Sequence, residues 1–227
     1  MRNRVSVLFA RAKHILETKG LGSLVKRSLI YVVSRVFRYY SVYLYEHSMA
    51  ERNEEQFIPE INNLTFKIIS TNEQADELVK DGFEDIRWSP VIVDVRKCMD
   101  NGAIAFCFFV DKELAHIGWV GLSKEAKNCF DGLPYSVDFS HNQACTGGTV
   151  TIPKYRAKGL MQYGYYKRFQ FLQERAYRTS RNAVDRNNTA AQKAHAKFAP
   201  KIYAKAYYLQ IFRWKLWKES PIVPRAG

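Results

Sequence analysis

The fold is decided by one stretch of this sequence, VTIPKYRAKGL at residues 150–160. Its first residues are β-branched and favour a strand, and Pro153 marks where that strand leaves its sheet, because proline donates no hydrogen bond to a ladder. A basic turn ending at Gly159 follows, and residues 160–177 then read as a helix. A strand, a basic turn and a helix N-terminus present free backbone N–H groups, which suits a phosphate-bearing ligand.

A second stretch, NTAAQKAHAKF at residues 188–198, lies further along the chain. Together the two stretches resemble the GNAT (Gcn5-related) N-acetyltransferases over residues 64–218, because the order, the spacing and both motifs agree. The family's acyl-CoA motif, Arg/Gln-x-x-Gly-x-Gly/Ala after a strand ending in proline, is matched by Arg156 and Gly159. The family's next helix opens Asn-x-x-Ala and continues toward Tyr-x-Lys-Leu-Gly-Phe. It is matched here by Asn188, Ala191, His195, Lys197 and Phe198.

The sequence departs from the family pattern at three places. Met161 stands where the family prefers Gly or Ala, which makes the helix start bulkier beside the expected pyrophosphate. His195 stands where the family often has the tyrosine that acts as general acid. Ala199-Pro200 replaces the usual Gly-Phe and predicts a different exit from that helix.

The resemblance implies an α/β (α+β) fold, a GNAT-like mixed, mostly antiparallel central sheet flanked by helices, here with an N-terminal helical extension. We expect a basic amphipathic helical arm at 1–50, a linker at 51–63, the acetyltransferase domain at 64–220 and a tail at 221–227. One domain of this size has enough apolar residues for a sizeable core, since 47% of the 227 residues are hydrophobic.

The implied activity is that of an acyltransferase, with acetyl-CoA as cosubstrate and a primary amine as acceptor. A backbone N–H of Val150 or Thr151 would hold the thioester carbonyl, and N–H groups from Arg156 to Met161 would hold the phosphates. Asn188 would bond the pantetheine arm, cap its own helix, or do both. The expected acetyl-CoA-binding residues are Val150, Thr151, Ile152, Arg156, Ala157, Lys158, Gly159, Leu160, Met161 and Asn188.

The expected catalytic residue is His195, as general acid toward the departing thiolate. The alternative is that it is a packed or solvent-facing side chain. The sequence does not identify the general base: Asp138, His141 and solvent are the candidates. Three aromatic residues either line an acceptor pocket or belong to the core: Trp88, Trp119 and Tyr135.

Charge is unevenly spread over the chain, whose net charge is +13. Residues 154–218 hold sixteen Lys and Arg against two acidic residues, whereas residues 49–153 hold nine against seventeen. The basic half suits a ligand with several phosphates, and the acidic half suits a cationic amine; simple solubility is the alternative. The four cysteines have no metal-binding spacing, so we expect no metal site, free thiols and a reducing cytoplasm.

The N-terminal arm carries an apolar stripe with helical spacing over Leu21–Tyr45. Interspersed Lys and Arg argue against a membrane span, and no convincing signal-peptide cleavage site follows. A basic amphipathic helix of this kind packs on its own domain, packs across a homodimer, or lies peripherally at the inner membrane face.

The remaining elements follow from periodicity. We expect strands at 64–70, 103–110, 113–122, 143–152 and 182–184, a strand-rich tail at 203–216, and helices at 73–80, 160–177 and 189–198. Gly147-Gly148 within a strand predicts a bulge. On the helix at 160–177 we expect Lys167, Arg168 and Arg175 to face water.

Two other classes of protein remain open. A catalytically silent acyl-CoA-binding or membrane-associated scaffold would keep the fold without turnover. Basic and aromatic residues interleaved over 163–186 also suit a nucleic-acid-binding protein. We do not expect nucleic acid as the partner, because the sequence has no RNP, zinc-finger or helix-turn-helix signature. An amino sugar or a precursor of surface polysaccharide is a plausible acceptor if the arm contacts a membrane.

Overall fold

The computed structural model describes residues 22, 37–86 and 94–222, which belong to two compact units. The larger unit contains residues 42–206 and the short end 219–222. The smaller unit contains residues 37–41 and 207–218, together with Gly22. Each unit is described by itself below.

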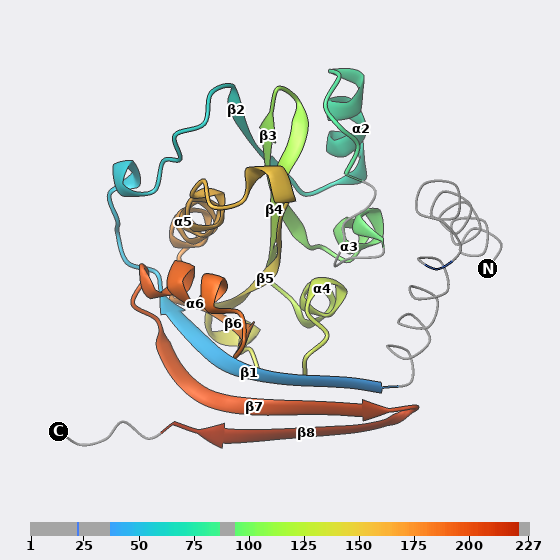
Figure 1. Ribbon diagram of the computed structural model, residues 1–227, viewed down its shortest axis with the longest axis vertical. Coiled ribbons are helices and arrows are strands. Elements are labelled where there is room, and N and C mark those ends of the chain that lie inside the picture. Colours follow the sequence, from blue (N-terminus) through green and yellow to red (C-terminus); the bar gives the residue numbers. More distant parts are fainter. Residues whose placement is uncertain (1–21, 23–36, 87–93, 223–227) are drawn as a thin grey trace. The chain divides into compact units, whose positions relative to one another are not determined.

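The predicted mixed, mostly antiparallel sheet is confirmed. Its eight strands run in the order β2-β3-β4-β5-β6-β1-β7-β8 (Figure 1). Neighbouring strands from β2 to β5 are antiparallel, as are β6 and β1, whereas β5 and β6 are parallel. The strands are β1 (Phe37–Ser48), β2 (Leu64–Ile69), β3 (Ile104–Val110), β4 (Glu113–Gly121), β5 (Gln143–Thr151), β6 (Thr179–Asp185), β7 (Lys201–Ile211) and β8 (Trp214–Pro221).

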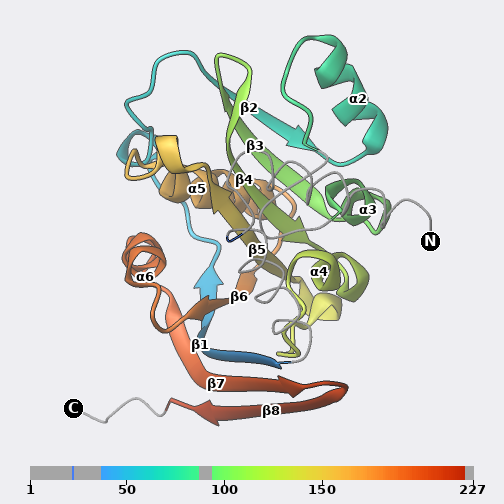
Figure 2. The same cartoon turned by 45° about the vertical axis from the view of Figure 1, so that its right-hand side comes forward.

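Helices cover both faces of the central strands of the larger unit. Figures 1 and 2 show α5 and α6 on one side of the sheet and α2, α3 and α4 on the other. The helices are α2 (Asn72–Lys80), α3 (Val95–Asp100), α4 (Lys124–Phe130), α5 (Leu160–Gln173) and α6 (Thr189–Ala196), with 3-10 turns η1 (Glu54–Gln56), η2 (Phe139–His141) and η3 (Pro153–Tyr155). Because both faces are covered, the continuous apolar run of β3 is buried from Ala105 to Val110.

The local signals of the sequence explain how these elements begin and turn. Thr71 caps α2 by accepting a hydrogen bond from the N–H of Gln74, at 3.3 Å. Asp111 and Lys112 both have positive φ, 50° and 68°, as a two-residue hairpin turn between β3 and β4 requires. The strands and helices that we expected between residues 64 and 198 are confirmed, with their ends shifted by a few residues. The strand-rich tail is two strands, β7 and β8, and helices α3 and α4 were not expected.

The helix expected over Leu21–Tyr45 is wrong over its described part. Residues 37–48 form β1, and its residues from Val42 to Ser48 pair antiparallel with β6. Val42 and Leu44 point to the core in strand-like alternation, and aromatic residues favour a strand when a partner strand is present. The rest of the expected arm, like the tail after residue 222, lies outside the described residues.

The segment expected to be a linker, residues 51–63, instead packs on α5. Phe57 is buried, and its ring stacks on Tyr166 of α5 and on Phe198, with centroids 5.2 and 5.0 Å apart. Glu54 bonds to Lys167 of that helix at 2.6 Å. Lys167 is therefore tied to the protein rather than directed to water. This segment fixes the position of α5 from outside the sheet.

The described residues contain no helix that is long and apolar enough to cross a membrane. In the same part of the chain, no group of three or more His, Cys, Asp or Glu is placed to hold a metal ion. The four cysteines are unpaired, and Cys107 and Cys145 are buried thiols in strands, as expected.

Candidate active site

The sheet opens between β5 and β6. These parallel strands are paired at only three positions, the last of which joins Cys145 to Arg181. Beyond it β6 continues along β1 as far as Asp185, while β5 continues along β4 to Thr151. Residues 147–151 are consequently half-buried although their strand lies in the middle of the sheet. This splay leaves one edge of β5 open next to the basic turn.

A bulge shapes the open edge of β5. Its register against β4 shifts, so that Val150 faces Ile117 and Gly147 faces Trp119. Three steps along β5 therefore match two steps along β4, and Gly148 takes φ +56° there. The bulge predicted from Gly147-Gly148 is confirmed.

The register selects between the two N–H groups considered for carbonyl binding. Ile152 donates its N–H to Ala115 of β4 at 2.9 Å. Successive residues of an antiparallel strand alternate between facing the partner's hydrogen-bonding groups and facing away from them. Since Ile152 faces β4, Val150 also does, and the N–H of Thr151 points toward the splay. Thr151 is thus the better candidate of the two.

The turn after β5 exposes its charges and its backbone. Tyr155 is buried and anchors the turn, while Arg156 and Lys158 are exposed. Ala157 and Gly159 have positive φ, 60° and 81°, and this pair of left-handed residues turns the chain into α5. The sequence-predicted residues from Val150 to Met161 are therefore brought together along one edge.

Gly159 is required for its conformation. A Cβ added there would lie 3.5 Å from Pro59, in ordinary contact, so space inside the protein is not what requires glycine. Its φ of 81° is the property that L-residues rarely adopt. Gly159 thus sets the direction of the helix start, and Pro59 of the packed segment lies against it.

The first turn of α5 offers free N–H groups. Tyr163 donates to the carbonyl of Gly159 at 3.1 Å, which is the first bond of the helix ladder. The N–H groups of Leu160, Met161 and Gln162 precede it and have no carbonyl within the helix, as at any α-helix N-terminus. The helix dipole adds a partial positive charge at this end. These groups and the exposed Arg156 and Lys158 fit a pyrophosphate.

Met161 and Asn188 each have a clear structural role. The side chain of Met161 packs against the cluster of Tyr45, Val184 and Ala191, so it occupies space in the core. Asn188 caps α6 by accepting from the N–H of Ala191 at 3.0 Å. The capping role predicted for Asn188 is confirmed, and its contact with pantetheine stays a prediction.

His195 belongs to a buried chain of polar side chains. Asn182 of β6 donates to His195 Nε2 at 3.2 Å, so Nδ1 carries the proton and donates to His47 Nε2 at 3.1 Å. The ring is 1% exposed and stacks on Tyr45. Both nitrogens are therefore occupied by protein groups.

The surroundings of His195 keep it neutral. Burial, followed by the neighbouring His47 and the guanidinium of Arg168, holds the pKa of His195 well below its usual range. A general acid must carry a transferable proton and reach the leaving group. This placement counts against the expected catalytic role and favours the alternative, a packed histidine.

Arg168 is the functional candidate that sequence reasoning placed wrongly. It was expected to face water, but it is fully buried between α5 and the sheet. Its Nε donates to the carbonyl of Gly164 at 2.9 Å and its Nη1 donates to Thr149 Oγ1 at 3.1 Å. The guanidinium lies 3.8 Å from the centre of the Tyr165 ring. Among the described residues no carboxylate pairs with it, so a buried cation holds the bulged part of β5 directly.

Two glycines make room for the buried side chains of Arg168 and His116. They are the sequence signal that could have predicted this burial. A Cβ at Gly118 would lie 2.7 Å from the guanidinium carbon of Arg168. A Cβ at Gly164 would lie 2.6 Å from Nε2 of His116, a fully buried ring. A glycine inside a helix facing a glycine-containing strand predicts large side chains between them.

We expect Gly164→Ala to destabilise the protein by about 2 kcal/mol, because the new methyl group overpacks against the His116 ring. Alanine in place of glycine normally stabilises a helix by about 1 kcal/mol. Urea unfolding measures the difference. In the His116→Ala background the same substitution should be neutral or stabilising, and a stabilising effect in the parent protein would contradict the packing described here.

The remaining candidates are not brought to the splay. Asp138 and His141 form an exposed hydrogen bond, with Oδ2 and Nδ1 2.8 Å apart, at the opposite end of β5 from the turn. Bonds from Ser140 and His141 lower the pKa of Asp138, which makes it a weaker base. Trp119 and Tyr135 are core residues: the first stacks on Phe130 and the second bonds to Asp131. Trp88 lies outside the described residues.

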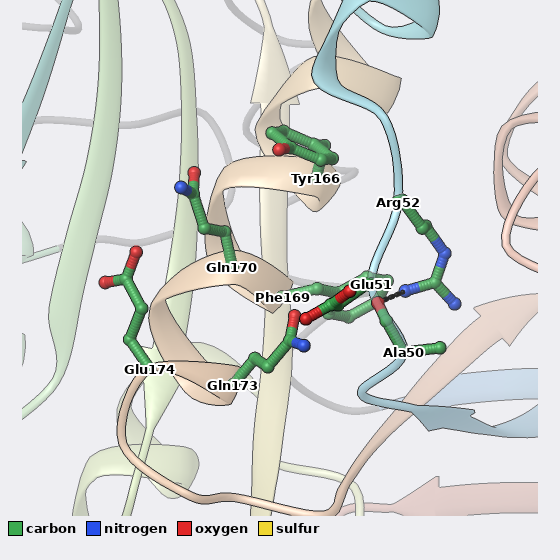
Figure 3. A pocket seen from close by; sticks show the side chains of 8 residues that line it. All are labelled: Ala50, Glu51, Arg52, Tyr166, Phe169, Gln170, Gln173 and Glu174. Atoms are coloured by element: carbon green, nitrogen blue, oxygen red, sulfur yellow. Dashed lines mark hydrogen bonds between the residues drawn. The ribbon is translucent and has the colours of Figure 1, made fainter.

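A separate hollow of about 400 Å³ lies along the C-terminal half of α5. Figure 3 shows Arg52 and its neighbours from the packed segment on one side of it and side chains of α5 on the other. Its lining residues are Ala50, Glu51, Arg52, Tyr166, Phe169, Gln170, Gln173 and Glu174. None of the expected site residues lines this hollow.

Solved structures share this architecture. A GNAT-family acetyltransferase from Colwellia psychrerythraea is 14% identical, with a TM-score of 0.50 over 82% of this chain and 61% of that chain. A GCN5-related N-acetyltransferase from Sphaerobacter thermophilus is 13% identical, with a TM-score of 0.48 over 88% and 57%. This chain spans about three fifths of the length of these proteins.

No protein-family model and no curated protein matches this sequence. The likeness to the Colwellia protein shows the fold, which is the one that the two sequence motifs indicated. The chain therefore has the GNAT fold, with its motif residues at the splay of β5 and β6 and at the start of α5.

Proposed function

We propose that this protein is an acyl-CoA-dependent N-acetyltransferase that moves the acetyl group of acetyl-CoA to a primary amine. The observation that carries the proposal is the open edge of β5, which leads through the exposed turn at 156–159 to the free N–H groups of α5. That edge combines a binding position for an acyl carbonyl with a binding position for a pyrophosphate.

The reaction needs little covalent chemistry from the protein. The amine nitrogen forms a bond to the thioester carbonyl carbon, the carbon–sulfur bond breaks, the nitrogen loses a proton and the thiolate gains one. The N–H of Thr151 would polarise the carbonyl, and Arg168 would act as a positioning residue, since it holds Thr149 and the bulge beside it. Arg156, Lys158 and the first turn of α5 would hold the phosphates.

His195 fits this scheme as a positioning residue. We expect His195→Ala to lower the stability by about 2 to 3 kcal/mol, since a buried ring and two hydrogen bonds are lost. A residue that donated the proton to the thiolate would instead cost roughly 10² to 10⁴ in turnover at nearly unchanged stability. Urea unfolding and steady-state turnover of the same variant distinguish these two roles.

A second candidate is a silent acyl-CoA-binding protein. The occupied nitrogens of His195 and the placement of Asp138 and His141 away from the splay favour it, because none of the expected acid–base residues then reaches the thioester. Binding of acetyl-CoA without turnover across a wide panel of amines would support this candidate over the enzyme.

The acceptor is proposed only as a chemical class, and the cellular location only as a compartment. The acidic first half of the domain suits a cationic amine, and an amino sugar or a precursor of surface polysaccharide has the required primary amine. The cysteine usage suits a reducing cytoplasm.

Calorimetric titration with acetyl-CoA tests the proposed function, with 3′-dephospho-CoA as the matched ligand. We expect micromolar binding that weakens when the 3′-phosphate is missing, because the turn and the C-terminal half of the chain are basic. No binding of either ligand would refute both the enzyme and the silent binder.

A further inference from the structure

The smaller unit exposes a row of apolar side chains on one face. Tyr39 of β1 stacks on Tyr207 of β7, with ring centroids 6.4 Å apart, so these two rings share a face. Strand alternation places Phe37 on the face of Tyr39, and Ile211 on the face of Tyr207. This face is solvent-exposed: Phe37 and Tyr39 are 48% and 54% accessible.

The outer strand of this unit extends the same face. Trp217 of β8 contacts Tyr208, which alternation places on the side opposite to Tyr207. Trp214 and Leu216 therefore lie on the face of Tyr207, and they are 67% and 48% exposed. We call this set the aromatic face: Phe37, Tyr39, Tyr207, Ile211, Trp214 and Leu216.

The turn between β7 and β8 adds a protruding tip. Phe212 has φ +54° and is 68% exposed, and Trp214 begins the next strand. A contiguous apolar surface of this kind is rare on a soluble protein without a partner. Isolated exposed residues are common, but six aligned on three strands are not isolated.

Charge complementarity identifies the partner. Residues 207–218 contain three cations and no acidic residue. Strand alternation places Lys218 on the face of Trp214 and Leu216, and Arg213 lies in the turn next to Phe212. A second copy of this chain would bring the same positive charges face to face, which is unfavourable in a symmetric contact. An anionic lipid surface supplies both an apolar layer and negative headgroups.

The residue types agree with a bilayer interface. Trp and Tyr are the side chains enriched where hydrocarbon meets headgroups, because each has an apolar body and a polar end. Lys and Arg next to them reach the headgroup phosphates while their stems stay on apolar surface. We propose that the aromatic face and its Phe212 tip bind the surface of an anionic membrane.

Vesicle co-sedimentation of the full chain tests the proposal. We expect the protein to bind vesicles that contain phosphatidylglycerol and to stay in solution with phosphatidylcholine alone, with binding weakened by high salt. Phe212→Ser/Trp214→Ser and Arg213→Glu/Lys218→Glu should each lower the bound partition at least about tenfold. Ile58→Ser, which removes an apolar side chain that is 54% exposed from the larger unit, is the matched control and should bind like the parent.

A second readout localises the contact. Trp214→Phe keeps an apolar ring at the tip, so it should still bind, but it should lose most of the fluorescence quenching by brominated lipid. Acetyl-CoA affinity and thermal unfolding of every variant report whether the larger unit is intact. The proposal is overturned by absence of binding to anionic vesicles, by binding that survives both double variants, or by self-association that disappears in Phe212→Ser/Trp214→Ser.

Discussion

Gly159→Asp is expected to weaken acetyl-CoA binding by about a hundredfold or more. The substitution places a carboxylate at the residue that precedes the free N–H groups of α5, where it repels the pyrophosphate and competes for the same donors. It also places an L-residue at φ 81°, which costs roughly 1 to 2 kcal/mol of stability. Calorimetric titration measures the affinity, and urea unfolding measures the strain.

Gly102→Asp is the matched control for that experiment. Gly102 has φ 79°, nearly the value of Gly159, and a Cβ there would meet no atom within 4 Å. Gly102 follows α3, on the opposite side of the sheet from α5, so it carries the strain without the repulsion (Figure 2). We expect it to lose similar stability and to keep the parent affinity. Equal affinity of Gly159→Asp and the parent would refute the proposed phosphate position.

Acid should unfold this protein well before its carboxylates are all protonated. Three of the four described histidines are fully buried: His47, His116 and His195. Burial and the charge of Arg168 lower the pKa of His116 to about 3; burial, Arg52 and Arg168 lower that of His47 to about 3. Burial lowers the pKa of His195 in the same direction.

The sign of the effect follows from proton binding. Well above pH 6.5 these histidines are neutral in both the folded and the unfolded state, so their burial costs no stability. As the pH falls toward 3, these histidines become protonated in the unfolded chain but stay neutral in the folded chain, so stability is lost. At pH 5 the loss is about 2 kcal/mol for each histidine with a pKa near 3. Two such losses are a large part of a typical stability of about 5 to 15 kcal/mol.

Urea unfolding at pH 7.5, 6 and 5 measures this dependence. His116→Gln should reduce the loss of stability between pH 7.5 and pH 5 by about 2 kcal/mol, because one buried histidine with a lowered pKa is removed. His141→Gln is the control, since it removes an exposed imidazole instead of a buried one. A stability that stays constant between pH 7.5 and 5 would contradict buried neutral histidines.

The motif region could be predicted from the sequence because its signals are local. Pro153, Gly159 and the cap at Asn188 each constrain their own backbone, and Gly147-Gly148 predicts the bulge within its own strand. The short apolar strands were found for the same reason. Helices α3 and α4 were not predicted, although each has its own N-cap, Asp94 and Ser123.

The misplaced parts depend on distant partners. Residues 37–48 carry an apolar pattern that also fits a helix, and β6 makes them a strand. Phe57 appeared to be in a polar linker, but its partners are on α5 and after α6. Arg168 looked like a surface cation, and the glycine opposite it provides the space for its burial. Contacts of this kind leave no periodicity in the sequence.

The position of β1 between β6 and β7 also sets the order in which the chain is able to fold. Glu46 of β1 pairs with Arg181 of β6, which lies 135 residues further along. At roughly 5 to 20 residues per second, a ribosome needs on the order of ten seconds to synthesise that interval. During this time an aromatic-rich strand has emerged without its partner. We therefore expect β1 to gain protection from hydrogen exchange together with β6 and later than β2, β3 and β4, whose partners lie close in sequence.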